Sequence, residues 1–399
     1  MRRNSLQGLA VCLACILLFW STALAQTKSV ATSSKDVANA AKVAYPGAPG
    51  LAVAPKRSSA ASSDGPDRSR RFEIEFHGGG MFSSNPDGGK SALPAAGATF
   101  TDAAGGPTRP VSSWMFGDGA ALYNAFSAAS IGGVMTTTMT PLDAVITRQV
   151  GDRNNGGGIG FRVGVDLNKR FGLEWSTDYT WTSVELKKSF LAGLEATRSS
   201  FGTTFTDLAT NYYTFGGVGD AISDTRRRSE GGQLFNTLSA NIYLKTSGRL
   251  IPYITAGGGF VSNVGPSPHA AILGHYVLNG AAENTDTVNI VAHSDSTQGL
   301  GLIGIGAKYY ATPHWGLRFD FRDHLMGNGM STRLDATPVA TTALPFGPTS
   351  PGTTPDIQFG SAAGQPDSLS GPALSKFRTF RGDGVRNQFG INVGVFFRF

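Results

Sequence analysis

The stretch Gln388-Phe-Gly-Ile-Asn-Val-Gly-Val-Phe-Phe-Arg-Phe399 alternates between two kinds of side chain. One set is entirely apolar: Phe389, Ile391, Val393, Val395, Phe397 and Phe399. The other set is mostly small or polar: Gln388, Gly390, Asn392, Gly394, Phe396 and Arg398. A period of two predicts a β-strand with one apolar face. In a soluble sheet that face would cover a core. In a membrane barrel it would face lipid, and the polar face would line the lumen.

Seven earlier segments show a similar strand pattern, although glycines blur the faces of one of them, 251–261. These segments are 71–82, 159–165, 171–181, 237–244, 251–261, 303–310 and 317–322. Short turns follow the second, fourth and sixth segments. The long connections follow the others, at about 83–157, 188–231, 264–297 and 328–385. Four structureless connections of this size are unusual in a soluble domain. Alternating short turns and long loops are typical of an outer-membrane barrel.

The sequence therefore predicts an all-β fold, a transmembrane up-and-down antiparallel β-barrel of eight strands over residues 71–399. Its four long loops would be extracellular, and both chain termini periplasmic. A ten-stranded barrel, with two more strands from the first or fourth loop, is the alternative. Helical spacing at 114–129 predicts a helix that packs on the barrel mouth or folds into it. The proline-rich fourth loop is expected to be irregular.

The first residues have the pattern of an export signal. Arg2 and Arg3 precede an apolar segment, and Ala23-Leu24-Ala25 offers small residues for cleavage. This pattern predicts a cleaved signal peptide over 1–25, with a retained anchor as the alternative. Both cysteines lie within this segment, so the exported chain is expected to contain none.

Residues 26–70 are rich in Ala, Ser, Pro and Lys, without helical or strand periodicity. They predict a disordered periplasmic tail. The formal net charge of the whole chain is only +6, and the basic residues are scattered. That balance gives no support for nucleic-acid binding.

The last strand resembles the closing strand of Gram-negative outer-membrane barrels, whose terminal aromatic residue is an assembly signal. Val393, Val395, Phe397 and Phe399 carry this match. The architecture over 71–399 resembles small eight-stranded outer-membrane proteins, the OmpA transmembrane-domain and OmpW-like group. The resemblance implies that Phe399 engages the outer-membrane assembly machinery, and that the barrel contacts outer-membrane lipid and lipopolysaccharide. The long loops depart from this group, and we expect no OmpA-type peptidoglycan-binding domain after the barrel.

The inward faces of the predicted strands collect charged side chains. The set is Glu73, Glu75, Arg162, Glu174, Asp178, Lys308, Arg318, Asp320 and Arg322. Charges in a narrow lumen lose hydration, so opposite charges are expected to pair. Eight strands leave an interior that side chains just fill. We therefore predict a closed lumen packed with charges. A narrow gated pore is the alternative that the OmpA resemblance favours, whereas a route for small apolar solutes would need an apolar lumen.

Enzymatic activity has little support in the sequence. Some eight-stranded barrels modify lipid A with Ser and His near the outer rim, and this chain has His324 and Ser331. The lipid A deacylase pattern requires Ser two residues after the His, where this chain has Met326. We interpret His324 as a neutral rim residue and predict no enzyme, cofactor or metal site.

Arg226-Arg227-Arg228 lies in the second long connection. It is either a solvated loop run or a contact for lipopolysaccharide phosphates, because guanidinium groups match phosphate geometry. Taken together, the patterns predict an outer-membrane protein with a structural or surface-interaction role. The external ligand of the loops is not encoded in any recognisable motif.

Overall fold

The described part of the computed structural model covers residues 72–86, 88–91, 93, 100–101, 107–111, 113–129, 136–211, 219–276, 284–336, 339–342, 358–360, 366–368 and 377–399. The predicted signal peptide (1–25) and tail (26–70) lie outside these residues. All the described residues belong to one compact unit, Ser63–Phe399.

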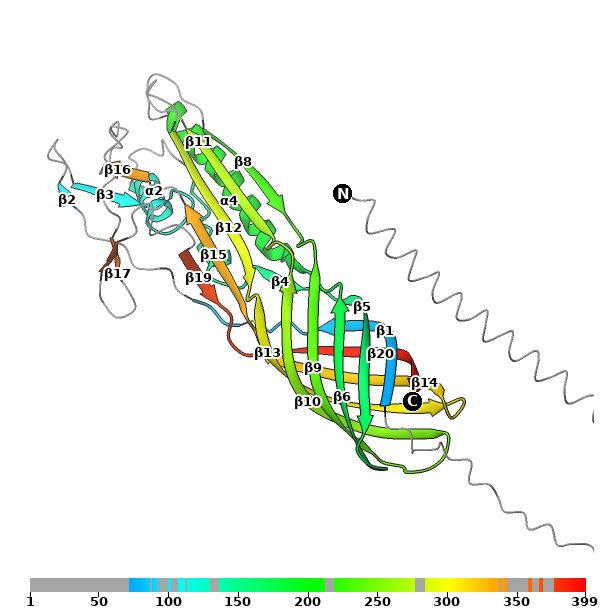
Figure 1. The fold of residues 1–399 in the computed structure, drawn as a ribbon. Coiled ribbons are helices and arrows are strands. Elements are labelled where there is room, and N and C mark those ends of the chain that lie inside the picture. The colour runs from blue at the N-terminus through cyan, green and yellow to red at the C-terminus, as the bar shows by residue number, and fades with distance from the viewer. Residues whose placement is uncertain are drawn as a thin grey trace, which may run out of the picture. The chain divides into compact units, whose positions relative to one another are not determined.

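Eight strands form a closed barrel (Figure 1). They are β1 (Phe72–Ser83), β5 (Gly156–Asp166), β6 (Phe171–Thr180), β9 (Gly232–Tyr243), β10 (Leu250–Val264), β13 (Thr297–Tyr310), β14 (Trp315–Gly327) and β20 (Val385–Arg398). Every pair of neighbours is antiparallel, and β20 pairs with β1 to close the ring. The eight-stranded prediction is confirmed, and the ten-stranded alternative is wrong.

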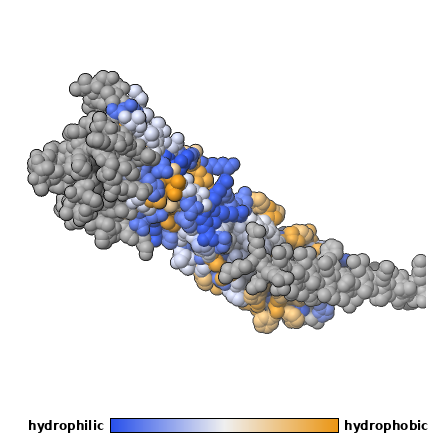
Figure 2. Space-filling model, turned by 90° about the horizontal axis from the view of Figure 1, so that it is seen from above, coloured by the Kyte–Doolittle hydropathy of each residue, from blue (hydrophilic) through white to orange (hydrophobic). Residues whose placement is uncertain are grey.

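The two faces of each barrel strand differ in the way that the alternation predicts. On β20, Val393 is 49% exposed on the outside, whereas Arg398 on the inside is 2% exposed. Large apolar side chains are exposed around the outer surface, as the orange regions in Figure 2 illustrate. Such a belt is unfavourable in water and favourable in lipid. Among the described residues, no helix is long and apolar enough to cross a membrane.

A second sheet continues the barrel wall beyond its loop end, the end opposite the short turns. It contains β8 (Gly219–Arg226), β11 (His269–Tyr276), β12 (Asn284–Ser294), β15 (Met330–Ala336) and β19 (Phe377–Arg381). The strand order in this sheet is β19-β15-β12-β11-β8. The barrel strands next to these in sequence are β20, β14, β13, β10 and β9, and they follow one another in the same order around the barrel. Five barrel strands therefore extend past the barrel, and Figure 1 shows the two sheets running on from each other.

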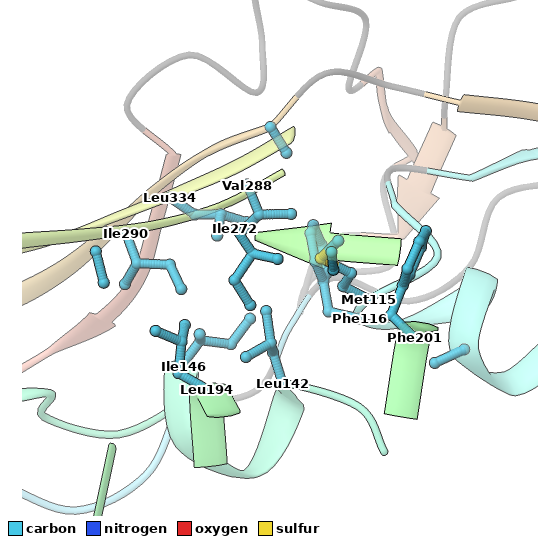
Figure 3. Close-up of a cluster of buried hydrophobic side chains, with 14 of the residues drawn as sticks. Met115, Phe116, Leu142, Ile146, Leu194, Phe201, Ile272, Val288, Ile290 and Leu334 are labelled. Atoms are coloured by element: carbon cyan, nitrogen blue, oxygen red, sulfur yellow. The ribbon is translucent and has the colours of Figure 1, made fainter. Parts of the chain in front are cut away.

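Three helices cover one face of this second sheet: α2 (Asp118–Ala129), α3 (Asp143–Ile146) and α4 (Lys188–Asn211). Their apolar side chains form one buried cluster with the sheet, part of which Figure 3 shows. Phe201 stacks on Phe205 with ring centroids 4.4 Å apart, and the Tyr123 hydroxyl donates to the Thr204 carbonyl at 2.7 Å. We call this sheet with its three helices the loop domain.

Two predictions for the long loops, the position of the helix at 114–129 and the irregular fourth loop, are wrong in part. The segment 114–129 does contain a helix, but α2 packs against α4 in the loop-domain core, neither on nor in the barrel mouth. The fourth loop is not irregular throughout, because β15 and β19 belong to the sheet. Leu334 and Ala336 of β15 are buried in the core, which offsets the effect of the prolines that follow.

The remaining strands are short. One small sheet consists of β2 (Phe100–Thr101), β3 (Pro107–Val111) and β16 (Val339–Thr342), and β17 (Gln358–Gly360) pairs with β18 (Pro366–Ser368). Strands β4 (Gly151–Arg153) and β7 (Val184–Leu186) also pair with each other; β4 precedes barrel strand β5 in sequence, and β7 follows barrel strand β6. This pair brings Arg153 to the barrel mouth.

One carboxyl group is enclosed in the loop-domain core. Asp286 of β12 is fully buried, and its Oδ2 accepts hydrogen bonds from the Ser113 hydroxyl and the Trp114 amide, both at 2.7 Å. Burial raises the pKa of Asp286 to about 7, although these hydrogen bonds oppose the shift. The folded loop domain therefore retains a proton that the unfolded chain releases at lower pH.

Replacing Phe201 by Ala should destabilise the loop domain by about 3–5 kcal/mol, because it removes a stacked ring from a closed core. The barrel should keep its heat-modifiable gel mobility while the loop domain becomes sensitive to protease. Thr203→Ala, at an exposed position on the same helix, is the matched control. Loss of heat-modifiable mobility in Phe201→Ala would contradict the separation of barrel and loop domain.

Loop-domain stability should fall as pH rises from about 4 to about 7, since the unfolded state loses the Asp286 proton first. Below this pH range Asp286 is protonated in both the folded and the unfolded state. Above it the loss of unfolding free energy is constant, at roughly 4 kcal/mol for a pKa shift of about three units. Asp286→Asn should abolish the slope. The pH dependence is measured by unfolding the loop domain in urea at pH 5 and at pH 8, with protease sensitivity as the signal for unfolding. An unchanged slope in Asp286→Asn would refute the assignment.

Candidate functional site

The barrel lumen contains the densest set of charged side chains in the described structure. All nine charged residues predicted for the lumen lie on the inward face, and eight of them are buried; the ninth, Asp178, has a side chain that is 16% exposed. Their placement follows from strand geometry, since residues i, i+2 and i+4 share a face. Arg318, Asp320 and Arg322 are related in this way on β14.

The centre of the lumen is a network of ion pairs that crosses between strands. Glu75 on β1 lies directly opposite Arg162 on β5, with 2.7 Å between Glu75 Oε1 and Arg162 Nη1. From β14, which only β20 separates from β1, Arg318 Nη1 lies 3.0 Å from Glu75 Oε2. Arg318 also pairs with Glu174 on β6, and Arg162 with Asp320. Each of these arginines thus bridges two carboxylates.

Neighbouring polar groups extend this network. Arg322 Nη2 lies 2.6 Å from Glu174 Oε1, and Arg318 Nε donates to the Tyr253 hydroxyl at 2.6 Å. Asn241 Nδ2 donates to Glu174 Oε2 at 3.1 Å. Buried charges are tolerated when they are both paired and hydrogen-bonded, and these contacts provide both.

Two further groups of polar contacts bring in residues that the predicted set did not include. Towards the short turns, Lys308 Nζ lies 2.6 Å from Glu73 Oε1, and Arg398 pairs with Asp166. Towards the loop domain, His77 bonds to Asp178. Asp166, Arg398 and His77 have the same inward parity as their neighbours, so the alternation that found the other charges could also have found them.

Inward glycines make room for the network. A Cβ atom at Gly306 would lie 2.2 Å from the Tyr253 hydroxyl oxygen and 2.7 Å from an Asp320 oxygen. At Gly160 it would lie 2.7 Å from His77 Nε2. These glycines stand opposite large polar side chains on the neighbouring strands, and this explains why several inward positions carry no side chain.

Apolar layers close the lumen on both sides of the charges. The layer near the loop domain consists of Met81, Phe235, Val261, Leu300, Leu302 and Met326. The layer near the short turns consists of Tyr243, Ile251, Tyr253, Tyr310 and Phe396. Neither layer was predicted, because the first draws its members from five strands and the second from four, with one or two residues per strand.

A polar layer lies above the first of these, where the loop domain meets the barrel. Arg153 Nη1 donates to the Thr182 carbonyl at 2.8 Å and Nη2 to Asn263 Oδ1 at 2.7 Å. Gln388 Nε2 donates to Gln233 Oε1 at 2.8 Å. Burial, together with the nearby positive Arg386, lowers the pKa of Arg153 to about 9. The barrel mouth is therefore covered by polar side chains of the barrel strands and by Arg153 of β4.

The interpretation of His324 as a rim residue is wrong. His324 faces the lumen and is buried; its Nδ1 lies 3.1 Å from the Gln388 carbonyl oxygen, and its ring packs on Phe235. The reason is that β14 continues to Gly327, so position 324 is still inside the barrel. Ser331 belongs to β15 in the loop domain, opposite His293. No hydrogen bond between His324 and Ser331 occurs in the described structure.

The run Arg226-Arg227-Arg228 has partners within the chain. Arg226 Nη2 lies 2.8 Å from Glu230 Oε1, Arg227 Nε lies 2.9 Å from Glu185 Oε1, and Arg228 Nε donates to the Ser183 hydroxyl at 2.6 Å. The first two pairs neutralise charge locally at the base of the loop domain.

The remaining site prediction concerns Phe399. This residue is 63% exposed, and its amide donates to the Phe72 carbonyl at 3.0 Å. Its role as an assembly signal stays a prediction. Among the described residues, no group of three or more His, Cys, Asp or Glu side chains could hold a metal ion.

No protein-family model and no curated protein matches the chain. Among solved structures, the chain is similar to the outer membrane protein OprG from Pseudomonas aeruginosa, with 10% identity and a TM-score of 0.33 over 83% of this chain and 97% of that one. Neisserial surface protein A matches with 10% identity and a TM-score of 0.26, over 82% and 97%. The outer membrane protease OmpT from Escherichia coli matches with 11% identity and a TM-score of 0.28, over 84% and 97%.

Similarity at this level does not distinguish one barrel function from another. The fold is established by the strand pairing, the closed ring and the exposed apolar belt. On these grounds the chain is an eight-stranded up-and-down β-barrel with the architecture of small Gram-negative outer-membrane proteins.

Proposed function

We propose that this chain is an outer-membrane barrel with a closed lumen, and that it serves to hold the loop domain at the cell surface. The observation that carries the proposal is the sequence of layers inside the barrel: an aromatic layer, a charged layer, an apolar layer and a polar cover. A channel needs a continuous polar path, and the apolar layer near the loop domain interrupts it.

The proposed orientation has the short turns in the periplasm and the loop domain outside. Outer-membrane barrels have short periplasmic turns and longer extracellular loops. Strand β1 begins and β20 ends at the turn side, which is consistent with periplasmic termini. A cleaved signal peptide over 1–25 and contact with the assembly machinery through Phe399 belong to the same proposal.

A gated pore is less well supported than a closed barrel. Gating would exchange the partners of Arg318 or Arg162, and each already bridges two carboxylates. Such an exchange rearranges the charged layer only. Phe235 and Phe396, in the two apolar layers, carry no charge and would stay in place.

The purified protein should be silent in planar-bilayer recording. Arg318→Ala should also be silent, because the apolar layers remain closed. Adding Phe235→Ala and Phe396→Ala to that variant should give small, brief openings. A large steady conductance of the unmodified protein would defeat the closed-lumen proposal. Brief openings that lengthen in Arg318→Ala alone would favour the gated pore.

Glu174→Gln should destabilise the barrel by about 3–5 kcal/mol, because it leaves Arg318 and Arg322 buried with too few carboxylates. Glu185→Gln removes the same charge from the partly exposed pair with Arg227, and should cost less than about 1 kcal/mol. Tryptophan fluorescence during urea unfolding in lipid vesicles measures both. Equal effects of the two substitutions would mean that the lumen network does not stabilise the barrel.

A further inference from the structure

Three arginines stand on the solvent side of the loop-domain sheet. Leu334 and Ala336 of β15 point into the core, so Arg333, at the intervening parity, lies on the opposite face. Arg378 of β19 is directly opposite Arg333, and Arg381 is opposite Ser331, on either side of a register shift. Arg378 and Arg381 are exposed, and Arg333 is half-buried.

A histidine completes the group. His293 of β12 is opposite Ser331, on the next strand. Burial lowers the pKa of His293; the positive charges of Arg333 and Arg378 lower it further, while the negative charge of Asp295 opposes the shift. We call His293, Arg333, Arg378 and Arg381 the arginine cluster.

The arginine cluster differs electrostatically from the lumen arginines and from Arg226 and Arg227. In the described structure, no ion pair or hydrogen bond engages the side chains of Arg333, Arg378 or Arg381. The lumen arginines are bridged by carboxylates, and Arg226 and Arg227 have Glu230 and Glu185. Like charges directly opposite each other on a sheet are destabilising. The pair Arg333–Arg378 is therefore unfavourable unless an anion lies between the two groups.

The position of the cluster indicates the source of that anion. Two residues, 328 and 329, link β14 to β15, and two others, 295 and 296, link β12 to β13. Odd-numbered residues of β14, such as Phe319 and Phe321, belong to the exposed apolar belt, and odd-numbered Arg333 continues the same face. The cluster thus stands on the outer side of the wall, beyond the lipid-facing surface. Figure 2 shows a hydrophilic region beside the apolar surface of the barrel.

We propose that the arginine cluster binds the phosphate groups of a phosphorylated glycolipid in the outer leaflet. Guanidinium groups bind phosphate through paired, charge-assisted hydrogen bonds. The barrel part of the same wall contacts lipid, so the headgroup of a lipid beside it could reach the cluster. A free anion would gain no affinity from the closeness of the cluster to the lipid. The inference rests on the proposed function, because it requires the loop domain to lie on the side of the membrane that carries the glycolipid.

The test uses the full-length exported chain, folded in phosphatidylcholine nanodiscs that contain a small fraction of bisphosphorylated glycolipid. A second set contains the same glycolipid without its phosphates, and a third contains no glycolipid but adds inorganic phosphate. Native mass spectrometry counts the glycolipids that stay bound. The variants are Arg378→Gln, the double variant Arg333→Gln/Arg378→Gln, and the charge-matched control Arg170→Gln/Arg249→Gln, which changes two exposed arginines of the short turns. Heat-modifiable mobility checks that each variant folds.

The unmodified protein should retain the phosphorylated glycolipid only. Affinity should fall about tenfold for each arginine removed from the cluster and stay unchanged in the control. An equal loss of affinity in the control would mean that binding depends only on the net charge of the protein. Binding of inorganic phosphate with the same affinity would identify a free anion as the ligand. Either result overturns the inference. Retention that is equal in all variants overturns it too. A chain that fails to enter the bilayer as a heat-modifiable barrel would instead refute the proposed function.

Discussion

The requirement that every backbone hydrogen bond be made inside the protein determines much of this structure. In lipid an open sheet edge has no partner, so the sheet must close, as β20 does on β1. Eight strands close around an interior that side chains fill. Once the lumen is filled, each charge placed there needs an opposite charge within reach, and the Arg318 contacts with Glu75 and Glu174 satisfy that need.

The barrel could be predicted from the sequence because its signal is local. Alternation along one strand, such as Phe389 to Phe399, reports both the strand and its two faces without any knowledge of the neighbours. The same parity identified Arg162, Glu174 and Arg318 as lumen residues. It could not identify which carboxylate each arginine would bind, because the partners lie on β1, β6 and β14, whose proximity depends on closure.

The loop domain could not be predicted in the same way. Strands β11 and β12 pair with each other, but β8, β15 and β19 of the same sheet lie in two other long connections, so the sheet depends on contacts between distant segments. The 24-residue helix α4 is amphipathic only with respect to that sheet, where Phe201 and Phe205 meet Tyr276. His324 was misplaced for a related reason, since its location depends on where β14 ends.

The continuity of the wall strands has a mechanical consequence. Since only residues 295–296 and 328–329 separate β12 from β13 and β14 from β15, the loop domain has no hinge along these strands. Any tilt of the barrel that a thinner or thicker bilayer imposes must pass to the loop domain by the same angle. A force applied to the loop domain would act along the length of the barrel strands. It would shear many interstrand hydrogen bonds at the same time. The barrel and the loop domain therefore tilt as one rigid unit, whose orientation in a membrane responds to bilayer thickness.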